Sequence, residues 1–115
     1  MYYDANITAK NHGSMESIHE FLGWVLDIPG GYGNDIPSLE AALLARKEPL
    51  HFYVRSQQEL RWKFGWRTTK QLLAMFDRVV EQNPAFSYSL YPSEDSSWPE
   101  IKGDYRQALK AKQDL

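Results

Sequence analysis

Strand-like segments alternate with pairs of helix-like segments along this chain, and that order restricts the fold more than any other feature. Short runs rich in β-branched, aromatic or alternating apolar residues occupy positions 6–9, 50–54 and 85–91. Each interval between them holds two segments with the apolar spacing or the capping residues of a helix. Strands separated by helices need crossover connections, which produce a parallel sheet covered by helices. We therefore expect an α/β domain with a three-stranded parallel sheet flanked by about four helices.

A polar residue that can accept a hydrogen bond from the first helical turn precedes each helix-like segment. These candidate caps are Ser14, Asp35 or Asn34, Ser56, and Thr68 or Thr69. A proline or glycine near positions 29, 65 and 84 ends three of the four segments. The sequence therefore predicts where the helices begin as well as how many there are.

The composition changes after residue 91. Residues 92–97 form a polar linker, and residues 104–113 have the spacing of a weakly amphipathic helix. Tails of this kind are often mobile. We therefore expect one domain over residues 1–91, followed by a linker and C-terminal extension over residues 92–115.

Charge is distributed unevenly along the chain. The total is −2, but residues 1–40 carry a net −5 and residues 41–82 a net +4. A chain polarised in this way can present an acidic face to a basic partner. Alternatively, folding mixes the two blocks in space, and the sequence does not decide between these outcomes.

Several classes of protein are disfavoured. There is no cysteine, so there is no disulfide framework, thiolate metal site or thiol nucleophile. No apolar run approaches the roughly 18 residues of a membrane span. The first residues lack a basic patch followed by an apolar stretch, so no secretory signal is visible and we expect a cytoplasmic protein.

No residue pattern indicates catalysis. The three histidines, His12, His19 and His51, have no metal-ligand spacing, and no serine stands in a nucleophile elbow. Glu16 lies three positions before His19, which favours an ion pair on one helix face. We therefore expect no enzyme activity, no metal and no cofactor.

Residues 61–67 interleave basic and aromatic side chains, the composition of a surface for single-stranded nucleic acid. On one helix, however, Trp62 and Trp66 are four positions apart and can both anchor a core. We favour burial of both rings, and so do not expect direct nucleic-acid binding. A nucleic-acid-binding module that uses Arg61 to Arg67, with Lys70 and Arg78, is the alternative function.

The start of the second helix combines acidic, aromatic and aliphatic residues. Asp35 and Glu40 flank this start, Ile36 lies between them, and Tyr32 precedes them in the loop. Protein interfaces use such mixtures to bury an anchor beside a charge. A helix cap alone would also account for Asp35.

A series of residues in the first third of the chain resembles a known family. Ser14 leads a helix that carries the pair Ile18–His19, and a Pro-x-x-Tyr-Gly turn follows at Pro29, Tyr32 and Gly33. This series is similar to the barstar family, the intracellular inhibitors of the ribonuclease barnase. With the order of the later segments, the resemblance covers about residues 5–91.

The resemblance implies a three-stranded parallel sheet with four helices, and a surface that plugs a nuclease active site. In the family, acids on the second helix mimic RNA phosphates. Those acids fall on Pro37 and Ala41 here, the family's helix tryptophan falls on Glu40, and an acid of the fourth helix falls on Arg78. Either Asp35 and Glu40 supply displaced acidic groups, or the partner is not a barnase-like enzyme.

The resemblance therefore implies an immunity protein that neutralises a cognate toxin, a ribonuclease, by stoichiometric binding. No membrane takes part in this role. The residues that we expect to contact the toxin are Tyr32, Gly33, Asn34, Asp35, Ile36 and Glu40.

Overall fold

The computed structural model describes residues 3–93 and 95–113, and it confirms the α/β class. Four strands form one mixed sheet in the order β1-β2-β3-β4. Their bounds are β1 Asp4–Ile7, β2 Leu50–Val54, β3 Phe86–Leu90 and β4 Glu100–Lys102. The first three strands run parallel, and β4 runs antiparallel to β3. The ends of the two expected units, at residues 1–2 and 114–115, and residue 94 of the expected linker lie outside the described residues.

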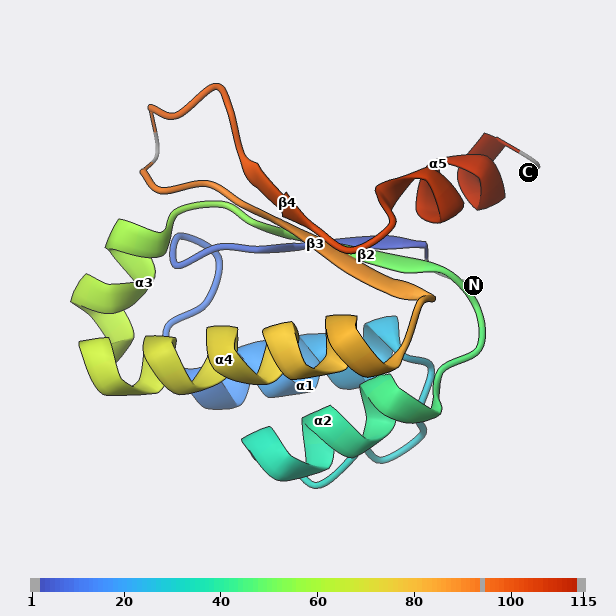
Figure 1. Cartoon of the computed structure of the whole chain (residues 1–115). Helices are drawn as coiled ribbons and strands as arrows, with labels where there is room; N and C mark the ends of the chain where they lie inside the picture. The colour runs from blue at the N-terminus through green and yellow to red at the C-terminus, as the bar shows by residue number, and fades with distance from the viewer. Residues whose placement is uncertain (1–2, 94, 114–115) are drawn as a thin grey trace.

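The described residues contain five helices, which pack on both faces of the sheet and at one end of it (Figure 1). They are α1 Met15–Val25, α2 Ile36–Ala45, α3 Gln57–Phe64, α4 Trp66–Gln82 and α5 Tyr105–Gln113. Figure 1 shows α1, α2 and α4 beneath one face of the sheet and α5 above the other face. Helix α3 lies beyond the C-terminal ends of the parallel strands (Figure 1). None of the helices in the described part of the chain combines the length and apolar character that a membrane span requires.

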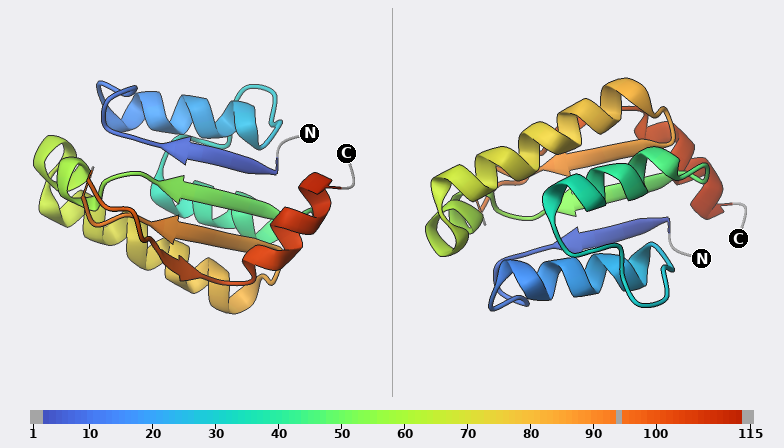
Figure 2. Two further views of the ribbon diagram at one scale, coloured as in Figure 1. Left: turned by 90° about the horizontal axis from the view of Figure 1, so that it is seen from above. Right: turned by 90° about the horizontal axis from the view of Figure 1, so that it is seen from below.

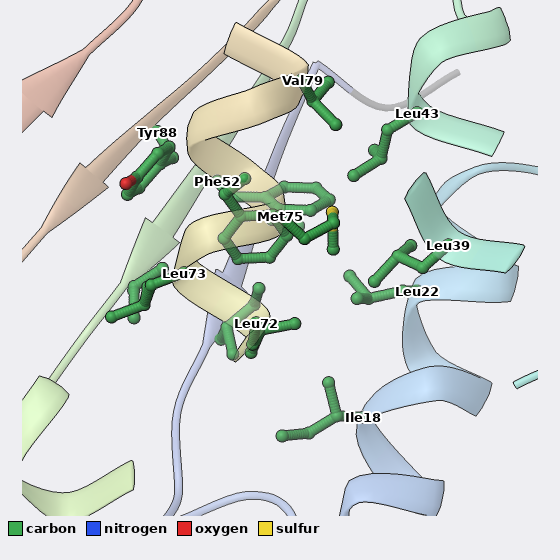
Figure 3. Close-up of a cluster of buried hydrophobic side chains, with 14 of the residues drawn as sticks. Ile18, Leu22, Leu39, Leu43, Phe52, Leu72, Leu73, Met75, Val79 and Tyr88 are labelled. Carbon is green, nitrogen blue, oxygen red and sulfur yellow. The ribbon is translucent and has the colours of Figure 1, made fainter. Parts of the chain in front are cut away.

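The main core lies between the sheet and the three helices beneath it. Phe52 of β2 packs with its ring edge against Phe76 of α4 and Phe86 of β3, at centroid distances of 5.5 and 5.2 Å. Figure 3 shows Ile18 and Leu22 of α1 directed toward the same cluster. Burial of large apolar side chains of this kind supplies most of the stabilisation of a domain this size.

The prediction of a three-stranded sheet is wrong in its count, because residues 100–102 add β4 at the open edge of β3. This strand has three residues, and Ile101 at its centre is half exposed. Backbone hydrogen bonds to β3, rather than buried side chains, hold this short edge strand in place. Its sequence therefore lacks the alternation of apolar and polar residues by which strands are recognised. The predicted helix over residues 104–113 is confirmed as α5.

Three predicted caps are confirmed. Ser14, Asp35 and Ser56 each accept a hydrogen bond from the backbone N–H three residues later. The prediction for α4 is wrong, because that helix begins at Trp66, ahead of both candidate threonines. Gly65, with φ of 93°, ends α3 and also precedes α4, so a single residue in a conformation that favours glycine redirects the chain.

The second face of the sheet carries a buried polar cluster under α5. The two ring nitrogens of His51 lie 2.7 and 2.6 Å from the hydroxyls of Ser87 and Ser89 on β3. The ring of Tyr105 on α5 covers His51 at a centroid distance of 4.2 Å. Burial lowers the pKa of His51 to about 4, although the carboxylate of Asp4 on β1 acts in the opposite direction. His51 is therefore neutral when the protein is folded at neutral pH.

Candidate partner-binding surface

The loop of residues 26–35 connects α1 to α2 and lies closely against α1. A Cβ added to Gly23 on α1 would lie 3.3 Å from the Cα of Gly31, so the two backbones nearly touch. Gly33 has φ of 112°, and a Cβ there would lie 2.8 Å from the hydroxyl of Ser38 in α2. Glycine at both positions therefore allows the loop to fold tightly between the two helices.

Tyr32 is half buried and fixed by a histidine. Its hydroxyl lies 2.5 Å from Nδ1 of His19 on α1, and burial raises the pKa of the phenol. His19 is buried, and this desolvation lowers its pKa. The predicted pairing of His19 with Glu16 is wrong, because the imidazole turns inward to Tyr32 while Glu16 is exposed. Both rings are therefore neutral and held in place at neutral pH.

Asp35 is an exposed carboxylate in a fixed position. Its Oδ1 accepts a hydrogen bond of 2.7 Å from the backbone N–H of Ser38, which caps α2. Hydrogen bonding by the side chain and the backbone N–H of Ser38 lowers the pKa of Asp35, so the side chain stays ionised. Its charge also acts on His19, which places it beside the middle of α1. The neighbouring Asn34 and Gly33 are exposed as well.

Glu40 forms an ion pair with a residue of its own domain. Its two carboxylate oxygens accept hydrogen bonds of 3.0 and 2.9 Å from Nε and a terminal nitrogen of Arg78 on α4. This pairing lowers the pKa of Glu40. The charges of Glu40 and Arg78 therefore largely cancel, and the free acidic group of the α2 start is Asp35.

Ile36 and Pro37 line a shallow groove and do not join the exposed loop residues 33–35. The groove lies between the first turn of α2 and the middle of α4, has a volume of about 420 Å³, and includes Lys70, Ala74 and Arg78. The structure thus brings Tyr32, Gly33, Asn34 and Asp35 together on one side of α2. It places Glu40 and Ile36 toward α4 instead.

The two charge blocks of the sequence meet where Glu40 of the acidic block pairs with Arg78 of the basic block, but most acids of the first block are exposed. Residues 11–45 hold five acids and no lysine or arginine. In the view from below in Figure 2, α1 lies next to β1, and α2 lies between α1 and α4. We call the exposed acids of this segment the acidic surface: Glu16, Glu20, Asp27 and Asp35. Glu16 and Glu20 stand one helical turn apart on α1.

Sequence reasoning missed two sets of aromatic residues. Trp24 on α1 is 62% exposed. The sequence could have indicated this exposure, because Trp24 lies outside the apolar stripe of that helix. The prediction that Trp62 and Trp66 are buried is wrong, because they are 89% and 59% exposed. Gly65 separates them into two helices, so their four-residue spacing does not place them on a common face.

No family model matches the chain, and no curated protein matches it. Within residues 3–93 and 95–113, no three His, Asp or Glu side chains gather in an arrangement that could hold a metal ion. The fold and the charged surfaces are therefore the features that bear on function.

Proposed function

We propose that this chain is a barstar-like inhibitor, an immunity protein that binds a cognate ribonuclease toxin and occludes its active site. The observation that carries the proposal is the acidic surface, whose four acids are exposed and whose Asp35 lies beside the fixed ring of Tyr32. The active site of a ribonuclease is cationic because its substrate is a polyanion. An acidic protein surface of matching shape can occupy such a site in place of RNA.

The order of the elements supports the proposal. From β1 to β3 the chain runs strand, helix, helix, strand, helix, helix, strand, with the three strands parallel. This is the arrangement that the resemblance to barstars implies over about residues 5–91. The loop before α2, which the resemblance assigns to the toxin interface, lies on the outside of the domain (Figure 2).

The geometry of the loop suits tight binding. The hydrogen bond to His19 holds Tyr32, and the cap of α2 holds Asp35. Side chains that are already fixed lose little conformational freedom on association, which favours affinity. Tyr32 supplies an aromatic contact and Asp35 a carboxylate for a cationic phosphate site. The mechanism is occlusion by binding, with no covalent step.

Asp35 is the residue that we assign to the phosphate site, since Arg78 already neutralises Glu40. The variant Asp35→Asn removes the charge but retains a good helix cap. We expect it to lower affinity for the cognate ribonuclease at least tenfold, the size of a moderate interface hot spot. Isothermal titration calorimetry against the cognate ribonuclease measures this, after that ribonuclease has been identified by pull-down from the source cell or from the adjacent reading frame.

The matched control is Asp104→Asn. Asp104 is exposed and accepts a hydrogen bond from the backbone N–H of Arg106 at the start of α5, so the chemistry of the change is the same at a distant place. We expect the control to bind as the unaltered chain does. If Asp35→Asn also binds with unaltered affinity, Asp35 does not contact the toxin and the assignment is wrong.

A further inference from the structure

We propose that the outer face of α3 and the start of α4 form a binding site for single-stranded nucleic acid, separate from the acidic surface. We call it the basic-aromatic surface, and its residues are Arg61, Trp62, Lys63, Trp66, Arg67 and Lys70. Figure 1 places α3 and the start of α4 at the end of the sheet where the parallel strands terminate.

The exposed tryptophans are the first argument. The side chain of Trp62 is 89% exposed, and that of Trp66 is 59% exposed. Leu60 is the buried apolar anchor of α3, so Trp62 is not needed to hold that helix on the domain. A single exposed ring is common on protein surfaces, but two exposed indoles within five residues of a basic segment form a composition suited to binding. Each base of a single strand offers a flat face for stacking on such a ring.

The shape of the surface is the second argument. Trp62 stands between two open grooves, one lined by Ala9, Lys10 and Lys63 and the other by Arg61, Pro92 and Ser93. Arg61 also lines a third groove, of about 430 Å³, which contains Trp66 and Lys70. Two acids line this groove as well, but Glu100 pairs with Lys102 and Asp77 accepts a hydrogen bond from Tyr88. The three grooves are neighbours, because Trp62 is shared by the first two and Arg61 by the second and third.

Charge is the third argument. Residues 55–70 hold five basic residues and one acid, a net charge of +4. Among the described residues, the side chains of Arg61 and Arg67 have no ion-pair partner, so their charges are available to phosphates. The ammonium of Lys70 lies 4.8 Å from the ring centre of Trp66, which brings a cation beside a stacking surface. α4 begins here without a side-chain cap, so its N-terminal dipole adds to the positive potential.

Single strands fit these features better than a duplex or an acidic protein does. A duplex hides the faces of its bases, so it can use the cations but not the tryptophans. An acidic protein would also use the cations, but it has no regular series of flat rings to match two exposed indoles. The occupant that uses rings and cations together is a single-stranded polynucleotide.

Fluorescence anisotropy tests the proposal, with labelled oligo(U) and oligo(dT) of about ten nucleotides. We expect the full chain to bind at least one of them at micromolar concentration in about 50 mM salt, and to bind a duplex of equal length more weakly. The two probes also show whether the site prefers RNA or DNA. Binding should weaken with salt, with a slope of about −2 in a double-logarithmic plot if three phosphates are contacted.

Variants distinguish stacking of bases on tryptophan from electrostatic attraction of phosphates to basic side chains. We expect Trp62→Leu to weaken binding at least fivefold, and Trp62→Phe to retain most of it because a ring remains. Arg61→Ala should weaken binding and reduce the salt slope. The matched controls, expected to bind normally, are Trp24→Ala and Arg106→Ala, which change an exposed tryptophan and an exposed arginine on α1 and α5.

Two results would overturn the proposal. One is the absence of binding to either oligonucleotide at about 100 μM protein and low salt, which would leave the tryptophans to a protein partner. The other is equal binding of single strands and duplex that Trp62→Leu does not change, which would show charge attraction without stacking. Circular dichroism checks that each variant is folded; all the substituted side chains are exposed. Asp35→Asn should leave oligonucleotide binding unchanged, so this site and the proposed toxin interface can fail independently.

Discussion

The free energy of unfolding is expected to fall by about 3 kcal/mol when the pH is lowered from about 7 to about 4, through His51 alone. An imidazole in the unfolded chain has a pKa near 6.5, whereas burial lowers the pKa of His51 to about 4. Between these values the unfolded chain binds a proton that the folded chain excludes. Stability is therefore fully present above pH 6.5 and is lost as the pH falls toward 4.

The structural cause is the cover that α5 places on His51. The two ring nitrogens of His51 already contact serine hydroxyls, and Tyr105 of α5 lies over the ring. Water therefore could not hydrate a charged imidazole at this position. Desolvation also lowers the pKa of His12 and of His19, so these residues change stability in the same direction. The fall with acid should therefore be steep, and α5 should loosen as part of it.

The variant His51→Gln isolates this contribution. Glutamine can hydrogen-bond both serines but does not titrate, so we expect denaturant unfolding to show a curve of stability against pH that is flatter by about 3 kcal/mol. His12→Gln is the matched control, and it should leave most of the fall in place. If the curve for His51→Gln is as steep as that of the unaltered chain, His51 is not the buried proton-excluding group that the structure indicates.

The second large effect concerns the acidic surface. The combined variant Glu16→Lys, Glu20→Lys and Asp35→Asn is expected to weaken the complex with the cognate ribonuclease at least a hundredfold. The change replaces attraction of a basic enzyme by repulsion, so most of the loss should appear as a slower association rate. The unaltered complex should associate more slowly in added salt, whereas the variant should associate faster, because salt screens repulsion as well as attraction.

Surface plasmon resonance at several salt concentrations measures both rates. The matched control is Glu81→Lys, Asp95→Lys and Asp104→Asn, which changes the net charge by the same amount at exposed positions elsewhere. If the control variant weakens the complex as much as the acidic-surface variant does, net charge alone controls association. The acidic surface would then have no special role.

The sequence predicted most of the fold because its local signals are strong. Ser14, Asp35 and Ser56 cap the helices as expected, and β2 has the predicted bounds. β4 has no comparable signal, since its place depends on the open backbone edge of β3 rather than on its own side chains. The sequence indicated that a helix ends near Gly65, but the start of α4 was predicted too late, because α4 follows Gly65 directly and has no side-chain cap.

The candidate site was less predictable, because its chemistry depends on pairs that are distant in sequence. The ion pair of Glu40 with Arg78 joins residues 38 positions apart, and only the packing of α2 on α4 brings them together. His19 likewise meets Tyr32 only because the loop returns to α1. A resemblance can assign a residue to an interface, but it cannot say whether that residue's charge is already used within the domain.

A titration of ribonuclease activity is the decisive test of the proposed function. The cognate ribonuclease, identified by pull-down from the source cell or from the adjacent reading frame, is assayed on RNA with increasing amounts of this chain. Tight occlusion of the active site predicts that activity falls linearly and disappears at one equivalent, and that the acidic-surface variant shifts this titration to a large excess. Undiminished RNA cleavage with the chain in large excess would contradict the proposed function.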